Sequence, residues 1–174
     1  INGRPERVTL GRFPEMTVEQ ARKAATGTHA TINDGTNPNA VKRAEKARAV
    51  TLGDVLDDYL AHRDLKPATV HGYRRAVDDY LADWKGQPVA QITREKVERR
   101  HRKLTERGPT QANLVMRVLR ALLNYAGARL ENADGSPILA DNPVRRLSAT
   151  KTWNRTERRR TLIKPHQLKP WFDA

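Results

Sequence analysis

The sequence contains no cysteine among its 174 residues. Disulfide bonds and thiolate zinc sites are therefore excluded, and a reducing cytoplasm is compatible with this composition. The five histidines form neither an HExxH motif nor a pair at metal-binding spacing, so we expect no metal site and no cofactor. No run of about 18 apolar residues and no apolar signal segment is present, which argues against a membrane span. The chain begins with Ile1, which suggests a fragment of a longer protein.

Acidic residues are in the minority. The 20 Asp and Glu residues face 33 Lys and Arg residues, which gives a net charge of +13 and a pI of about 10.6. Such an excess usually indicates a nucleic-acid partner and, less often, an anionic membrane surface. RNA has little support, because the sequence lacks aromatic RNP-like strands and a GxxG loop. A helical protein-interaction module remains an alternative.

The most apolar stretch runs from Pro109 to Arg129 and predicts a buried central helix. Gly108 and Pro109 mark its start, where Thr110 is expected to cap the free backbone N–H groups. Its apolar residues include Leu114, and they leave one polar stripe at helical spacing, made of Asn113, Arg117, Arg120 and Asn124. Two arginines and two asparagines on one edge could face an anionic partner.

Three more amphipathic helices are expected before this one. The first covers residues 51–63, is capped by Thr51 and has its acids first and its bases last, the order that the helix dipole favours. The second runs from about Pro67 to Trp84 and reverses that order, which suggests a phosphate site at its start. The third, Arg94 to Arg107, has a thin apolar face and is mostly charged, as expected for a solvated surface.

The N-terminal part reads as a turn and a short strand in residues 1–13, followed by a helix. Thr17 and Gln20 form a capping box at the start of this helix. The helix is expected to end before Gly35, and an end at Gly27 is the alternative. Residues 33–39 form a loop, and residues 40–50 a charged helical linker.

Thr9–Pro14 (TLGRFP) and Ala21–Ala25 (ARKAA) resemble the end of the arm-binding domain of phage and prophage integrases, which are tyrosine recombinases. The segments from residue 51 to residue 147 resemble the core-binding domain of the same family. The resemblance implies a mainly α protein: a SAM-like four-helix bundle preceded by a truncated α+β arm segment. The expected divisions are 1–45 (arm domain), 46–50 (linker), 51–147 (core-binding domain) and 148–174 (basic linker and the first residues of a catalytic domain).

In this family the second and fourth bundle helices approach double-stranded DNA, and the basic linker follows its phosphates. The resemblance therefore implies the DNA-binding residues Lys66, Thr69, Arg74, Arg75, Thr110, Gln111, Asn113, Arg117, Arg120, Lys151, Arg155, Arg158, Arg159 and Arg160. The basic run in 148–161 is expected to be disordered when free.

The family's catalytic arginines, histidines and nucleophilic tyrosine lie in a domain that we do not find in this chain. Tyr59, Tyr73, Tyr80 and Tyr125 are interpreted as packing residues, so no catalytic residue is assigned. The expectation is a non-catalytic, DNA-binding part of a recombinase that integrates or excises DNA. The full-length protein would be a tetramer on DNA, associated with the bacterial nucleoid, and this chain a monomer. The alternative is a helical regulator or nucleoid protein without recombination.

Overall fold

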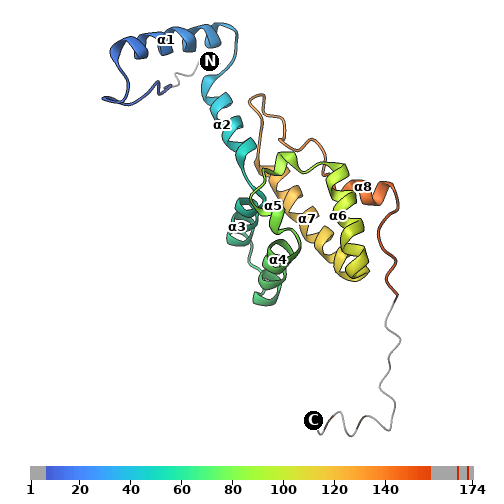
Figure 1. The fold of residues 1–174 in the computed structure, drawn as a ribbon. Helices are drawn as coiled ribbons and strands as arrows, with labels where there is room; N and C mark the ends of the chain where they lie inside the picture. The colour runs from blue at the N-terminus through green and yellow to red at the C-terminus, as the bar shows by residue number, and fades with distance from the viewer. Residues whose placement is uncertain (1–6, 158–167, 169–171, 173–174) are drawn as a thin grey trace.

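The computed structural model of the chain describes residues 7–157 together with Leu168 and Phe172. These residues are mainly helical and contain no β-strand beyond two isolated bridges. No helix in this described part is long and apolar enough to cross a membrane. In chain order the elements are α1 (Val18–Asn33), α2 (Pro38–Ala49), α3 (Leu52–His62), α4 (Pro67–Tyr80), α5 (Ala82–Lys85), the 3₁₀ helix η1 (Val89–Gln91), α6 (Arg94–Arg107), α7 (Pro109–Arg129) and α8 (Arg145–Ala149) (Figure 1).

The central helix of the bundle is α7, and it has the predicted bounds. It packs against α6, α3 and α4, and nine of its residues are buried. Leu114 is the exception to the predicted apolar surface, because 46% of it is exposed. The core around α7 is completed mainly by Leu52, Leu56, Val77, Leu81, Val97 and Leu147, all of them almost fully buried.

The N-terminal region is a separate arm of two helices (Figure 1). The predicted capping box is confirmed: Thr17 accepts a hydrogen bond from the Gln20 N–H, and the Gln20 side chain accepts one from the Thr17 N–H. The predicted strand is absent from residues 7–13, and residues 1–6 lie outside the described residues. A single strand without a neighbour has no partner for its backbone groups, which explains why this segment stays irregular.

The arm joins the bundle through the C-terminal end of α2. This helix corresponds to the helical linker predicted for residues 40–50, and it begins two residues earlier, at Pro38. Arg48 donates two hydrogen bonds to Asn132 Oδ1, at 3.2 and 2.9 Å, in the loop that follows α7. The backbone of Val50 pairs with that of Val89 in η1 at 3.0 Å. Two points far apart in the sequence therefore hold this end of α2 to the bundle.

The helix predicted between Pro67 and Trp84 is interrupted at Leu81, so the prediction of one helix is wrong. The Trp84 N–H bonds to the Leu81 carbonyl at 2.8 Å, which leaves the Tyr80 carbonyl free. Arg100 of α6 donates to that carbonyl at 3.0 Å, and its guanidinium lies 4.8 Å from the centre of the Trp84 ring. A tertiary contact therefore stabilises the break and allows Leu81 and Trp84 to be buried together.

The segment after α7 folds back along the bundle. Asn142 donates to Asn124 Oδ1 at 2.7 Å and to the Arg120 carbonyl at 2.9 Å, and α8 then lies against α6. After α8 the chain remains in contact with α6 and α7 as far as Asn154. The first part of the expected disordered linker is therefore docked on the bundle.

Candidate nucleic-acid interface

Two helices differ from the other long ones at their N-termini. Side chains of Thr17, Asn37, Thr51 and Thr93 cap α1, α2, α3 and α6. In contrast, α4 and α7 have no side-chain cap, and each has proline at its first position. The predicted cap by Thr110 is wrong, because α7 begins at Pro109 and Gly108 occupies the capping position. The first turns of both helices are therefore not satisfied by a capping side chain.

These two uncapped ends lie at the same end of the bundle, away from α1 and α2 (Figure 1). The arrangement follows from the topology, since α6 runs towards this end and α7 begins there. These two helix starts carry four of the predicted DNA-binding residues: Lys66, Thr69, Thr110 and Gln111. All are exposed except Gln111, which is half-buried.

Arg74 and Arg75 lie in the middle of α4 rather than in its first turn. Arg74 forms an ion pair with Asp57 of α3 at 3.1 Å, and Arg75 pairs with Asp79 at 3.3 Å. Because the helix dipole acts mainly within the terminal turns, the reversed charge order has less effect on these arginines than the sequence suggested. Both side chains remain more than half exposed and can exchange a carboxylate for a phosphate.

The polar stripe of α7 divides into two kinds of residue. Arg117 and Arg120 are exposed and form no ion pair with any described residue. Asn113 is only 4% exposed, so its predicted place on an exposed edge is wrong. Asn113 and Asn124 both bond to the returning segment instead. The arginines of the stripe are therefore free for a partner, whereas the asparagines hold the fold.

Lys151 and Arg155 are exposed in the segment after α8, and they too form no ion pair within the described part of the chain. Asn154 bonds to the Pro109 carbonyl at 3.2 Å, which places Arg155 beside the start of α7. Arg158, Arg159 and Arg160 lie outside the described residues. One cation absent from the prediction, Arg107, is exposed directly before Gly108; the basic run of α6 was the signal for it.

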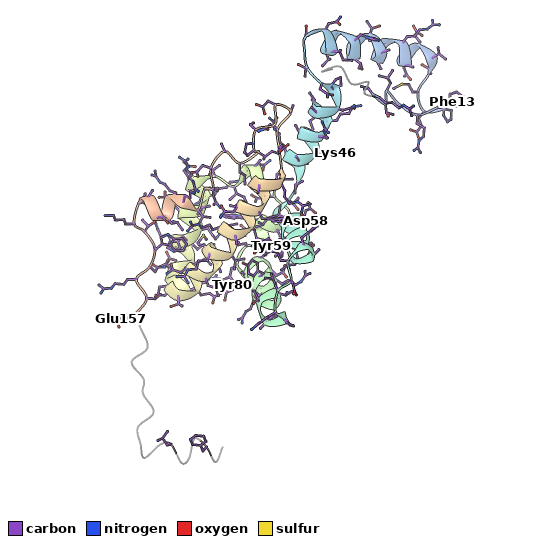
Figure 2. The ribbon with its side chains drawn as sticks, turned by 180° about the vertical axis from the view of Figure 1, so that it is seen from behind. Phe13, Lys46, Asp58, Tyr59, Tyr80 and Glu157 are labelled. Atoms are coloured by element: carbon purple, nitrogen blue, oxygen red, sulfur yellow. The ribbon has the colours of Figure 1, made fainter. Side chains whose placement is uncertain are left out.

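The tyrosines have the predicted packing role. The Tyr59 ring stacks on Tyr73, with 5.3 Å between the ring centres, and meets the edge of Tyr125 at 5.2 Å. Tyr59 itself lies within the bundle (Figure 2). Burial and the neighbouring Tyr59 hydroxyl raise the pKa of Tyr73 to about 12, so its phenol is harder to deprotonate than that of an exposed tyrosine. Tyr125 donates to Asp58 at 2.8 Å. Nowhere in the described residues do three or more possible metal ligands cluster.

The arm carries its own exposed surface at the other extreme of the molecule. In Figure 2, Phe13 lies at the tip of the arm, far from Glu157 at the opposite end. Arg12 and Lys23 of this arm are exposed and form no ion pair among the described residues, and Phe13 is 86% exposed. The chain therefore presents basic surfaces on both its arm and its bundle.

Comparison with protein families gives one match. Residues 2–45 match the model of the Arm DNA-binding domain. The N-terminal region is therefore similar to the Arm DNA-binding domain, which is typical of phage integrases. The match ends within α2 and does not reach the bundle. No curated protein and no solved structure shows a significant match to the chain.

Proposed function

We propose that this chain is the DNA-binding part of a site-specific tyrosine recombinase of the phage integrase type. The observation that carries the proposal is the match of residues 2–45 to the Arm DNA-binding domain. The net charge of +13 supports it, because an excess of this size is typical of proteins that bind nucleic acid. Residues 51–147 would be the core-binding domain, so that one chain contacts two DNA segments.

In this proposal the bundle contacts the recombination site with the end at which α4 and α7 begin. Exposed cations lie there and along α7, including Lys66, Arg117 and Arg155. The starts of the two helices without side-chain caps favour phosphate at the same end, because the helix dipole places partial positive charge there. Phosphate contacts of this kind position a protein on the duplex, and the exposed side chains of Thr69 and Thr110 could then reach base edges.

A salt titration of duplex affinity tests this surface. We expect the logarithm of the binding constant to fall linearly with the logarithm of the salt concentration. The double change Arg117→Gln with Arg120→Gln should lower both the affinity and that slope, by up to about 0.9 for each lost phosphate contact.

The matched control is Arg94→Gln with Arg145→Gln. These two arginines both pair with Asp141, near the start of α6 and therefore at the opposite end of the bundle. The control changes the net charge by the same amount and should leave the slope nearly unchanged. Equal effects of the two double variants would contradict the proposed surface and favour a general effect of net charge.

We also propose that the chain binds DNA without cutting it, and that the full-length recombinase acts as a tetramer on DNA. All four tyrosines pack in or against the apolar core of the bundle. The Tyr125 hydroxyl accepts from Arg129 and donates to the Asp58 carboxylate, so it is held by structural bonds. Incubation with a nicked suicide substrate should therefore yield no covalent protein–DNA adduct. A tyrosine-linked adduct on this chain would overturn the non-catalytic assignment.

A further inference from the structure

A two-point contact holds the chain after α8 against α7. Asn113 Nδ2 donates to the Asn154 carbonyl at 2.9 Å, and Asn113 Oδ1 accepts from the Asn154 N–H at 3.2 Å. One buried side chain therefore satisfies both backbone groups of a single residue, 41 positions later. A pairing of this kind fixes the direction of the chain as well as its position, because both a donor and an acceptor must align.

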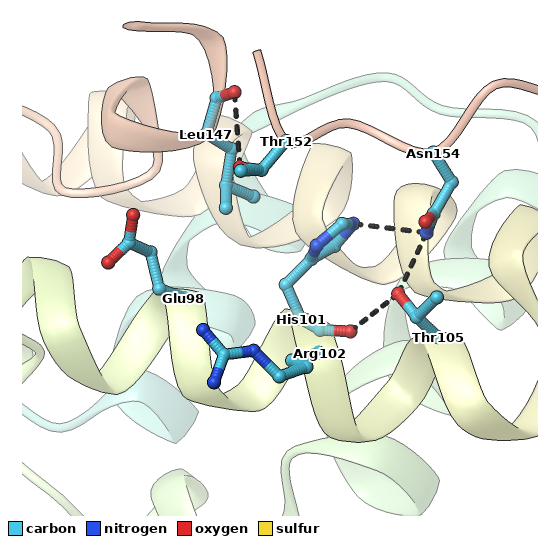
Figure 3. A pocket seen from close by; sticks show the side chains of 7 residues that line it. All are labelled: Glu98, His101, Arg102, Thr105, Leu147, Thr152 and Asn154. Atoms are coloured by element: carbon cyan, nitrogen blue, oxygen red, sulfur yellow. Dashed lines mark hydrogen bonds between the residues drawn. The ribbon is translucent and has the colours of Figure 1, made fainter. Parts of the chain in front are cut away.

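The side chain of Asn154 strengthens this contact. Its Nδ2 donates to Thr105 Oγ1 at 2.8 Å and to the Pro109 carbonyl at 3.2 Å, and lies 3.3 Å from His101 Nε2 (Figure 3). The Trp153 ring meets the edge of His101 at 5.9 Å. The residue before Arg155 is thus bonded to both α6 and α7.

The bonds of Asn154 to the bundle are polar, whereas Trp153 directly before it packs against the edge of the apolar core. Between α6 and the segment lies a cavity of about 250 Å³, whose lining includes Glu98, Arg102 and Thr152 (Figure 3). The segment is therefore not pressed into the core along its length. Breaking the asparagine contact should release it from α6 while the apolar core of the bundle remains intact.

We infer that Asn113 is a positioning residue, which holds residues 150–155 on the path where Lys151 and Arg155 meet DNA phosphates. The inference rests on the proposed DNA-binding function. Asn113 is too buried to contact DNA, yet it bonds the residue next to Arg155, at the end of the bundle where α7 begins. A segment that is already ordered loses less conformational entropy when it binds, so the contact increases affinity without a phosphate contact of its own.

The chain contains a matched control in Asn124. This second asparagine of the α7 stripe also bonds to a residue of the returning segment, Asn142 Nδ2, but before α8 rather than after it. Asn124→Ala removes the hydrogen bond between Asn124 of α7 and Asn142, and it leaves the contact between Asn113 and Asn154 in place. Asn113→Ala removes both bonds to the Asn154 backbone. Asn154→Ala keeps those two bonds and removes only side-chain bonds, such as those to Thr105 and the Pro109 carbonyl, without changing α7.

The experiment measures duplex affinity against salt concentration for the parent and the three variants, together with amide hydrogen exchange at Asn154. We expect Asn113→Ala to weaken binding about five-fold or more with an unchanged salt slope, because phosphate contacts remain but must be ordered on binding. Asn154→Ala should weaken binding less, because the two bonds from Asn113 to its backbone remain. Exchange at Asn154 should accelerate in Asn113→Ala and stay slow in Asn124→Ala, whose affinity should equal that of the parent.

The failures are distinguishable. A parent without salt-dependent DNA binding would contradict the proposed function itself. If the parent binds and Asn113→Ala binds equally well, the inference is wrong while the proposed function stands. An Asn124→Ala variant as weak as Asn113→Ala would also overturn it, since loss of bundle stability would then explain both. Fast exchange at Asn154 in the parent would show that the contact does not order the segment.

Discussion

The arm and the bundle differ most in how much of their surface they bury. No residue of α1 is buried, and Ala44 is the single buried residue of α2. In the bundle, α7 alone has nine buried residues. Yet the family match falls on the arm and not on the bundle. The part of the chain that is recognisable by its sequence is the part that is least able to stabilise itself, since buried apolar area supplies most folding free energy.

This contrast suggests that packing constrains the sequence of the bundle, whereas binding to a partner constrains the sequence of the arm. The bundle needs apolar residues of suitable volume, which many sequences supply. The arm buries too little to constrain its sequence by packing, so a recognisable pattern there points to a partner. Exposed apolar residues support this interpretation: Phe13 and Val18 are 86% and 68% exposed. The predictions below test whether the two regions differ in stability as they differ in burial.

The largest difference is expected from truncating one apolar side chain in each region. Leu119 of α7 is fully buried, so Leu119→Ala should lower the free energy of unfolding by about 2–5 kcal/mol. Val18→Ala in α1 removes a side chain that is already in solvent and should change it by less than about 0.5 kcal/mol. Chemical denaturation followed by circular dichroism measures both. A comparable loss for Val18→Ala would show that the arm packs against the bundle more closely than its exposure indicates.

A smaller difference is expected from the capping boxes, which both regions share. Thr51 accepts from the Asp54 N–H in α3, as Thr17 accepts from the Gln20 N–H in α1. Thr51→Ala should lower the global free energy of unfolding by about 1 kcal/mol, the usual effect of losing an N-cap. Thr17→Ala should leave the global value unchanged and instead speed amide exchange within α1, because helices with few buried contacts open locally. Equal global losses would mean that the arm and bundle unfold as one unit.

The sequence predicted most where its signals were local. The bounds of α7 follow from Gly108 and Pro109 at one end and an apolar pattern over 21 residues, and both were readable. The capping box of Thr17 with Gln20 and the cap by Thr51 were predicted from equally local signals, whereas the part of Asp54 in a second box was not predicted. The break at Leu81 was not predictable, because it depends on Arg100, which lies 20 residues after the Tyr80 carbonyl that it contacts.

The candidate interface shows the same limit. Exposed arginines such as Arg117 were predicted from helical spacing alone. Asn113 has the same spacing, but its burial is decided by a segment 41 residues away. Helical periodicity identifies the side of a helix on which a residue lies, and only the tertiary fold decides what covers that side.

The ends of α1 and α8 provide a third comparison, because both helices end in a residue with positive φ. In the arm this residue is Gly35, with φ 78°, and in the bundle it is Lys151, with φ 53°. In each case the next N–H bonds back to the fifth residue before it, as in a Schellman motif. Glycine adopts this conformation without strain, whereas other residues incur about 1–2 kcal/mol.

Lys151→Gly should therefore raise the free energy of unfolding by up to about 1 kcal/mol, after the greater freedom of glycine in the unfolded chain is subtracted. It should also weaken DNA binding and reduce the salt slope by about 0.9, if the lysine meets a phosphate. Gly35→Lys is the converse change and should destabilise the end of α1. Thermal melts and the salt titration check both. A Lys151→Gly variant that is more stable and binds normally would leave the strained lysine without a DNA-binding role.

The smallest expected effect distinguishes the two capping boxes by pH. Hydrogen bonds from the Thr51 side chain and backbone lower the pKa of Asp54, whereas the arm's box contains the amide of Gln20, which does not titrate. Because the pKa of Asp54 is lower in the folded chain, the ionised carboxylate contributes fully to the free energy of unfolding above the unfolded-state pKa of about 3.9. This contribution is lost as the pH falls through the folded-state pKa.

The stability difference between the parent and Asp54→Asn should therefore shrink between about pH 6 and pH 3, by a few tenths of a kcal/mol given the exposure of this carboxylate. The corresponding difference for Gln20→Ala, measured by exchange in α1, should be the same at both pH values once intrinsic exchange rates are corrected. A constant difference for Asp54→Asn would mean that the box stabilises α3 through its neutral hydrogen bonds alone, and that the charge adds nothing in either region.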